Sequence, residues 1–536
     1  MKRLKVISIF VTNFVLLFSF QTFAQAKEHD KKTEPLNEKI EMTGQSDKGN
    51  DTSNNEVPGN PEETQSKNLT EKTPSKTDDV NINSNEKKDE IKSGFRFGSY
   101  GRISIGTTTE GRSILKYEIV GHPQRIFENN YVEIDLGYNL DTGINKYVKI
   151  LMTTAIMGNF FHYTGDPQLQ AAVRNLYIEA KGYPVSWLAV WVGSRMYRGD
   201  DIYLLDFWPM DNLNTLGAGL IMSPGLWDFR IHAGVNRLND EFQYQEIKVA
   251  AEQFQPRTVV FMDRQRFISS LKITRFFLLS NGWEKGAKVS IYGEVHGLPA
   301  GYLYHENEPP EKIPSDFGWL VGIQGGIWGF SKDSWANVWL KYSGGLASYG
   351  ELSIPFDLQS DKKSTSARDF IAGISSNWEF GYGGIITGFY ARYFKDADPN
   401  VYDINDYWEG VLTVRLQMYP VSFLHVAVEA GESFRQTTGL ANTMPKFDPQ
   451  SQSFIPPPHE TPSVTNVALM LIYSPFGKGT FTRPQLRLLG SVQIPNAAAR
   501  HLYPEEDIRA GGDKIIDNLI WGIGVQAEWW FNSSYR

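Results

Sequence analysis

The stretch GSRMYRGDDIYLLDFWPMD, residues 193–211, mixes ionised and aromatic side chains closely. A solvated loop has no need of the aromatic rings, and a buried core rejects unpaired carboxylates. Asp200, Asp201 and Asp206 could act as metal ligands or as the carboxylates of a glycoside hydrolase, which retaining enzymes hold about 5–5.5 Å apart. The spacing of these residues in the sequence does not fix the distances between their carboxylates. Whether the protein is an enzyme is therefore judged from other catalytic motifs.

Those other signs are missing from the sequence. The chain contains no GxSxG elbow and no phosphate-binding loop, and its 9 histidines are scattered rather than clustered. The sequence therefore predicts that the protein is not an enzyme and that it uses no cofactor and no metal. We also expect no nucleic-acid partner.

The first 26 residues have the composition of an export signal. Lys2, Arg3 and Lys5 precede the apolar run at 6–20, and the small-x-small sequence Ala-Gln-Ala ends at Ala26. A run of about fifteen residues is short for a membrane-spanning helix. We therefore expect residues 1–26 to be a signal peptide and the mature protein to be exported. The absence of cysteine means that no disulfides are used.

Residues 27–92 are rich in Lys, Glu, Asn, Ser, Thr and Pro, and their few apolar residues follow no heptad. Such a segment cannot bury enough apolar surface to offset the entropy lost on ordering. The sequence therefore predicts a disordered polar N-terminal extension at 27–92 and a folded domain at 93–536.

The elements that must position the charged stretch are strands. In YVEIDLGYNL, residues 131–140, apolar side chains alternate with polar or aromatic ones, and the same period of two recurs in KVSIYGEVHG (288–297), FLHVAVEAGE (423–432) and WGIGVQAEWWF (521–531). Turn-rich stretches of unequal length separate these segments. The fold class predicted is all-β.

A period of two fits either a soluble sandwich or a membrane barrel. In a sandwich the apolar face meets a core, whereas in an outer-membrane barrel it meets lipid and the polar face meets a wet lumen. Strands of about ten residues suit a tilted membrane span, and the chain is 13% aromatic, as expected for aromatic girdles. We therefore favour a transmembrane antiparallel β-barrel. The last residues, 532–536, extend past the aromatic strand end that is usual for such barrels.

Several segments together resemble the maltoporin family of sugar-specific outer-membrane porins. The resemblance covers roughly residues 95–531, and its most specific part runs from AVRNLYIEAKGY to GAGL, including the charged stretch; GSYGRISIG (98–106), RIFENNYVEIDLG (125–137), TRPQLRLLGS (482–491) and GVQAEWWF (524–531) also match. The resemblance implies a barrel of about 18 strands with an inward-folded constriction loop, a homotrimer, and a place in the Gram-negative outer membrane.

The resemblance also implies a lane of aromatic rings along which sugars slide. Sugar ring faces pack on aromatic rings, while sugar hydroxyls hydrogen-bond with charged groups. The expected lane residues are Tyr100, Tyr131, Trp530, Trp408 and Phe356, with Trp408 a looser match. Phe161 or Tyr163 is expected at the channel entrance.

Ionic residues are expected opposite the lane, and Trp208 is expected at the constriction. The expected ionic track consists of Arg102, Arg125, Glu133, Arg174, Asp201 and Asp206. Where the family has an arginine before the first of these aspartates, this chain has Gly199 and Asp200, which changes the local charge.

The resemblance thus implies an outer-membrane channel for facilitated diffusion of oligosaccharides such as maltodextrins, with outer-membrane lipid around it. Two alternatives remain open, a nonspecific porin for ions and small solutes and a soluble lectin-like protein. Maltodextrin, sucrose and β-glucosides all remain open as the sugar.

Overall fold

The computed structural model describes residues 93–114, 116–158, 169–249, 257–280, 282–305, 308–399, 406–437, 446–448, 451–455, 461–502 and 519–535. The segments expected to be the signal peptide (1–26) and the polar extension (27–92) lie outside the described residues, as do Phe161 and Tyr163.

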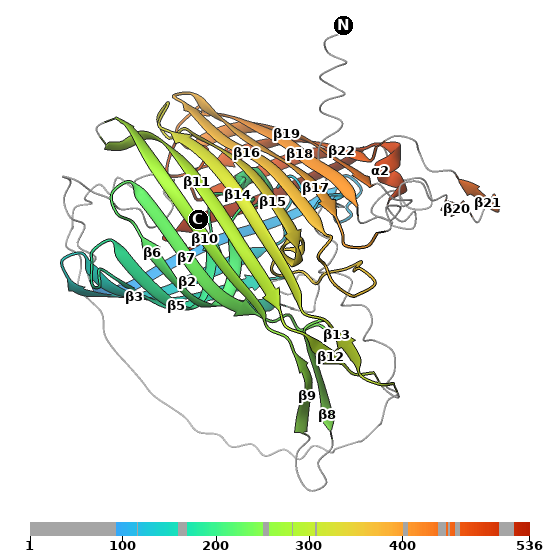
Figure 1. Cartoon of the computed structure of the whole chain (residues 1–536). Coiled ribbons are helices and arrows are strands. Elements are labelled where there is room, and N and C mark those ends of the chain that lie inside the picture. Colours follow the sequence, from blue (N-terminus) through green and yellow to red (C-terminus); the bar gives the residue numbers. More distant parts are fainter. Residues whose placement is uncertain are drawn as a thin grey trace, which may run out of the picture. The chain divides into compact units, whose positions relative to one another are not determined.

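Eighteen strands form one closed antiparallel sheet, in which each strand pairs with the next along the chain and β24 pairs with β1 (Figure 1). The barrel strands are β1 (Gly94–Thr108), β2 (Tyr131–Gly143), β3 (Lys146–Met157), β4 (Gln170–Lys181), β5 (Leu188–Arg198), β6 (Asn212–Met222), β7 (Trp227–Asn236), β10 (Arg266–Ser280), β11 (Gly282–Leu298), β14 (Asp316–Trp328), β15 (Trp335–Gly345), β16 (Arg368–Phe380), β17 (Gly383–Lys395), β18 (Tyr407–Met418), β19 (Leu424–Thr437), β22 (Ser463–Tyr473), β23 (Gln485–Pro495) and β24 (Ile520–Phe531). The predicted all-β barrel of about 18 strands is confirmed.

The remaining elements belong to the connections. They are the hairpins β8 (Tyr244–Val249) with β9 (Arg257–Asp263), β12 (Gly301–Leu303) with β13 (Glu311–Ile313), and β20 (Lys446–Asp448) with β21 (Ser453–Ile455), together with the short helices η2 (Tyr203–Leu205), η3 (Leu346–Tyr349) and α2 (Ala497–His501). No helix among these described elements is long and apolar enough to cross a membrane.

The alternation of side chains gives the sheet its two faces. On β2, Glu133 and Asp135 are buried inside the barrel, whereas Tyr138 and Leu140 on the opposite face are exposed. The same division holds in β11, β19 and β24. An apolar outer face and a polar inner face are typical of strands that stand between lipid and a lumen.

The inner face is largely covered because connecting segments fold into the barrel. Residues of the segment 109–130 and of the loop 199–211 pack with the inward side chains of several strands in one buried cluster. The core of the molecule therefore lies inside the cylinder, around the loop that carries the charged stretch.

Candidate functional site: the barrel lumen

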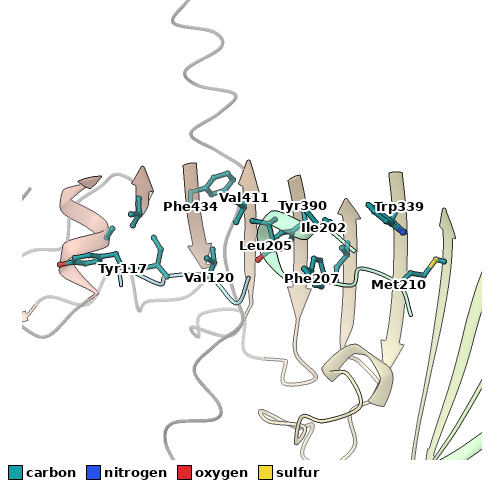
Figure 2. Close-up of a cluster of buried hydrophobic side chains, with 14 of the residues drawn as sticks. Tyr117, Val120, Ile202, Leu205, Phe207, Met210, Trp339, Tyr390, Val411 and Phe434 are labelled. Atoms are coloured by element: carbon teal, nitrogen blue, oxygen red, sulfur yellow. The ribbon is translucent and has the colours of Figure 1, made fainter. Parts of the chain in front are cut away.

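The loop 199–211, called here the constriction loop, lies against the inner wall of the barrel. Its apolar side chains Ile202, Leu205 and Phe207 pack beside Val411 and Tyr390 of β18 and β17, as Figure 2 shows. The Ile202 amide donates to the Phe207 carbonyl at 2.7 Å, which closes the loop tip. The aromatic and apolar residues of the charged stretch thus attach the loop to the wall.

Charged residues hold the two ends of the constriction loop. Lys288 lies 2.6 Å from Asp200 near the start of the loop, and Lys272 lies 2.6 Å from Asp211 at its end. Burial alone would raise the pKa of Asp200, but Lys288 and Lys272 outweigh it and hold that pKa well below its ordinary value. Asp200 therefore anchors the loop as a carboxylate.

The segment 109–130 clamps the constriction loop from another side. The Arg125 amide donates to the Leu204 carbonyl at 3.1 Å, and its guanidinium donates to the Tyr203 carbonyl at 3.1 Å. The His122 ring stacks on Phe207 with centroids 4.0 Å apart. Burial, with a smaller contribution from positive charge nearby, lowers the pKa of His122 to about 3, so this imidazole is neutral.

Three of the expected lane residues lie together on adjacent strands. Tyr100 of β1 is directly opposite Trp530 of β24 in the sheet register, and their rings stack with centroids 6.5 Å apart. The Tyr131 ring, at the start of β2, lies 6.1 Å from Tyr100. We call Tyr100, Tyr131 and Trp530 the aromatic wall.

Most of the expected ionic residues border this wall. Arg102 lies 2.9 Å from Asp206 of the constriction loop, and its guanidinium stands 5.2 Å from the centroid of the Tyr131 ring. Arg174 also lies near Tyr131, 5.8 Å from the centroid of its ring, and 3.1 Å from Glu133. Asp201 is partly buried at the start of the constriction loop. Ionised and aromatic groups therefore share one part of the lumen.

Sequence reasoning missed the ionic centre behind the wall. Glu528 of β24 lies 2.6 Å from Arg487 and 2.9 Å from Arg483, and it accepts a hydrogen bond from the Tyr203 hydroxyl at 2.7 Å. Arg125 joins the same carboxylate at 3.4 Å. The alternation of side chains along β23 and β24 predicts that Glu528 and Arg487 face the lumen. It does not predict that Tyr203 and Arg483 approach them, because these two residues lie in connections between strands.

Two expected lane residues do not belong to the wall. Trp408 of β18 is 46% exposed on the outer face, where its ring packs on Tyr393 at 4.6 Å, so its assignment to the lumen is wrong. Phe356 packs instead on Tyr349 and Phe394 in a separate cluster, with ring centroids 5.1 and 5.8 Å away. It is therefore not part of a continuous lane with Tyr100.

Trp208 stands where the constriction loop faces the wall. Arg198 lies over its ring at 3.8 Å from the centroid. Trp208 also borders a cavity of about 220 Å³ whose charged lining comes from other strands; this lining includes Glu294, Lys341, Asp369, Arg392 and Glu409, with Glu351 from the segment after η3. Trp208 is thus shared between the aromatic wall region and a charged cavity.

Acidic side chains of the stretch 193–211 pair with basic ones. Among the residues that the structure describes, no group of three or more His, Asp or Glu side chains is arranged to hold a metal ion. The carboxylates Asp200, Asp206 and Asp211 each have a basic partner instead. The charges of the stretch 193–211 therefore position the loop and border the lumen.

Comparison with solved structures finds outer-membrane channels at low identity. OpdK of Pseudomonas aeruginosa is 8% identical with a TM-score of 0.39, and the match covers 82% of this chain and 98% of that one. DcaP of Acinetobacter baumannii is 9% identical with a TM-score of 0.40, covering 82% and 96%, and Salmonella typhi OmpF in complex with daunomycin is 8% identical with a TM-score of 0.36, covering 82% and 97%. At these scores the likenesses add nothing to the family assignment.

No curated protein matches the sequence. The family described as "LamB porin", in contrast, matches residues 95–531, which span the barrel from β1 to the last residue of β24. Its members are porin channels, and the closed barrel with an apolar outer face agrees with a place in the outer membrane. The chain belongs to the LamB porin family of outer-membrane channels.

Proposed function

We propose that this channel conducts oligosaccharides of the maltodextrin type by facilitated diffusion along the aromatic wall. The observation that carries the proposal is the grouping of Tyr100, Tyr131 and Trp530 on three adjacent strands, with Arg102 and Asp206 beside them. Rings that offer flat apolar faces, flanked by charged hydrogen-bonding groups, match the two surfaces of a sugar.

The expected binding free energies for a sugar suit transport rather than storage. Burying about 40 Å² of a sugar face contributes roughly 1 kcal/mol, and a hydrogen bond to a charged group contributes about 1.5–3 kcal/mol. A few such contacts give about −4 kcal/mol, or a dissociation constant near 1 mM. Binding of this strength favours entry of the sugar without preventing its exit.

Block of the channel by sugars tests the proposal. In planar bilayers we expect maltodextrins to interrupt the ion current, and Trp530→Ala to weaken this block roughly fivefold, the effect of losing about 1 kcal/mol. Trp408→Ala is the matched control, because that ring points away from the lumen. Equal block in Trp530→Ala and the wild type would remove the aromatic wall from the sugar path.

A panel of sugars separates the alternatives. Maltodextrins, sucrose and β-glucosides titrated against the same channel identify the preferred substrate. Absence of block by every sugar would favour a nonspecific porin, a function to which the charged lining of the 220 Å³ cavity is also suited.

We also propose that the protein is a homotrimer, as its resemblance to maltoporins implies. Chemical crosslinking in the membrane followed by electrophoresis is the direct test, and a single crosslinked species of three subunits is expected.

A further inference from the structure

The segment after the last strand turns into the barrel. Phe531 is the last residue of β24 that pairs with β1, and the backbone of Asn532 then adopts φ = 47°. The side-chain amide of Asn532 donates to the Phe97 carbonyl at 3.3 Å. Gly98 makes room for this turn, because a Cβ there would lie 2.2 Å from the Asn532 carbonyl oxygen. We call Asn532–Tyr535 the inserted segment.

A row of polar side chains holds the middle of this segment. Asp135 and Thr153 are paired in the β2–β3 register, and Thr153 is paired with Asn175 in the β3–β4 register. The Ser534 hydroxyl donates to Asp135 at 2.8 Å and lies 3.1 Å from the Thr153 hydroxyl. The Ser534 amide also donates to Asp135, and Asn175 donates to the Ser534 hydroxyl at 3.4 Å.

Tyr535 occupies the space between the aromatic wall and the constriction loop. Its ring stacks on Tyr100 with centroids 4.0 Å apart and an interplanar angle of 11°. On another side it meets Trp208 edge-to-face at 5.6 Å. The hydroxyl donates to Asp206 of the constriction loop at 2.7 Å. Tyr100 is 0% exposed and Tyr535 only 7% exposed.

We propose that Tyr535 is an internal ligand of the slot between Tyr100 and Trp208, and that a permeating sugar must displace it. The inference rests on the proposed function for the identity of the competing ligand. Tyr535 makes the two kinds of contact that a pyranose would make there, a flat face against an aromatic ring and a hydroxyl donated to a carboxylate. Because one slot cannot hold both, the inserted segment competes with sugar.

Substitution of Tyr535 gives the first test. In planar bilayers Tyr535→Ala is expected to raise the single-channel conductance and to tighten sugar block several-fold, since the competitor is gone. Tyr382→Ala, in the exposed turn between β16 and β17 at 76% exposure, is the matched control and should change neither quantity. Conductance and block equal to the wild type in Tyr535→Ala would overturn the proposal.

A second variant displaces the segment without removing a ring. Gly98→Ala places a methyl group against the Asn532 carbonyl and should reproduce the higher conductance. Gly297→Ala on β11 is its control, because a Cβ there meets nothing within 4 Å. Wild-type conductance in Gly98→Ala, together with an unchanged sugar block, would count against the segment as the obstruction.

A reversible disulfide between the inserted segment and the barrel wall tests the proposal if either variant fails to assemble. The chain has no cysteine of its own, so Thr153→Cys combined with Ser534→Cys introduces one pair, at positions whose hydroxyl oxygens are 3.1 Å apart. Oxidation with copper phenanthroline should abolish sugar block and hold the conductance low, and dithiothreitol should restore both. Each single substitution is the control, and identical currents before and after reduction would overturn the proposal.

The results separate this inference from the proposed function. If Tyr535→Ala raises conductance but no sugar blocks either channel, the segment is an obstruction and the sugar assignment fails. If sugars block wild type and Tyr535→Ala equally at the same conductance, the sugar assignment stands and the internal ligand is rejected.

Discussion

At the residue scale, burial decides what each charged group inside this barrel can do. Glu528 is 1% exposed yet can stay ionised, because Arg483, Arg487 and Arg125 surround it. Removing Glu528 would be costly, since the buried guanidiniums would lose their compensating charge, and about 3–5 kcal/mol is typical for such a loss. The cluster therefore fixes the wall of the lumen behind Tyr203.

Glu351 is a buried carboxyl whose pKa is raised, and it gives a prediction on pH. It lies in the segment after η3, outside the strands, and lines the 220 Å³ cavity. Burial, reinforced by the nearby carboxylate of Glu294, raises the pKa of Glu351 to about 8. The carboxyl is therefore neutral at pH 6 and becomes negative as the pH passes 8, so the preference of the channel for cations should increase between pH 7 and 9.

Reversal potentials in a KCl gradient measure this preference. Glu351→Gln keeps the size and the polarity of the side chain but cannot ionise, and it should abolish the change between pH 7 and 9. A pH response that persists unaltered in Glu351→Gln would assign the titration to another group. The sign for stability follows from the same shift: the raised pKa stabilises the folded chain at acid pH, and this contribution is lost as the pH rises towards 8.

At the scale of elements, the constriction loop combines an apolar attachment with ionic anchors. Ile202 and Leu204 are 0% exposed, and the loop tip lies close to β17, where a Cβ at Gly388 would come within 2.9 Å of the Ile202 side chain. Lys288 and Lys272 hold the ends. The loop is therefore fixed at its tip and at both ends.

Loss of one anchor should make the loop move. Lys288→Met removes the ion pair with Asp200, worth about 1.5–3 kcal/mol as a charge-assisted bond. The hydrogen bond from Gln324 to Asp200 at 2.6 Å is kept. We expect excess current noise in single-channel recordings of Lys288→Met. Lys285→Met, at an exposed position on the same strand, is the control and should show the current noise of the wild type. Wild-type current noise in both variants would show that the anchor is dispensable.

The strands were predictable from sequence because alternation is local. Tyr131 and Glu133 on one face and Val132 and Ile134 on the other follow from the pattern alone, and the structure agrees. At Trp408 the alternation and the resemblance disagree. Glu409 and Arg415 are buried on the inner face of β18, so Trp408 faces outward, and the lumen position that the resemblance implies is wrong.

The inserted segment and the loop contacts were not predictable in the same way. The contact between Tyr535 and Asp206 joins residues from distant parts of the chain. No periodic pattern encodes such a contact, because it depends on where two irregular segments meet inside a closed barrel. The sequence nevertheless carried one sign, the residues that continue past the final aromatic strand.

At the scale of the whole molecule, pairing of β1 with β24 closes the sheet and leaves no edge strand in the main barrel. Closed barrels satisfy all backbone hydrogen bonds within the membrane, and this makes them resistant to unfolding. The protein should therefore migrate faster on electrophoresis without boiling than after boiling. Identical migration before and after boiling would contradict a stable barrel.

The N-terminal region gives the last prediction. We expect signal cleavage after Ala26, and we expect deletion of residues 27–92 to spare assembly and transport, because the family match starts at residue 95 and the first strand at Gly94. Heat-shifted migration and sugar block measure the two properties. Loss of assembled protein on deletion would show that the extension takes part in folding.

The position of the inserted segment has a consequence for biogenesis. Asn532 follows directly on the residue that completes the seam between the first and last strands, and its turn fits against Gly98 of the first strand. The pocket for this turn cannot exist until the two strands have met. If Tyr535 obstructs the slot as proposed, the obstruction is therefore in place as soon as the first and last strands have paired.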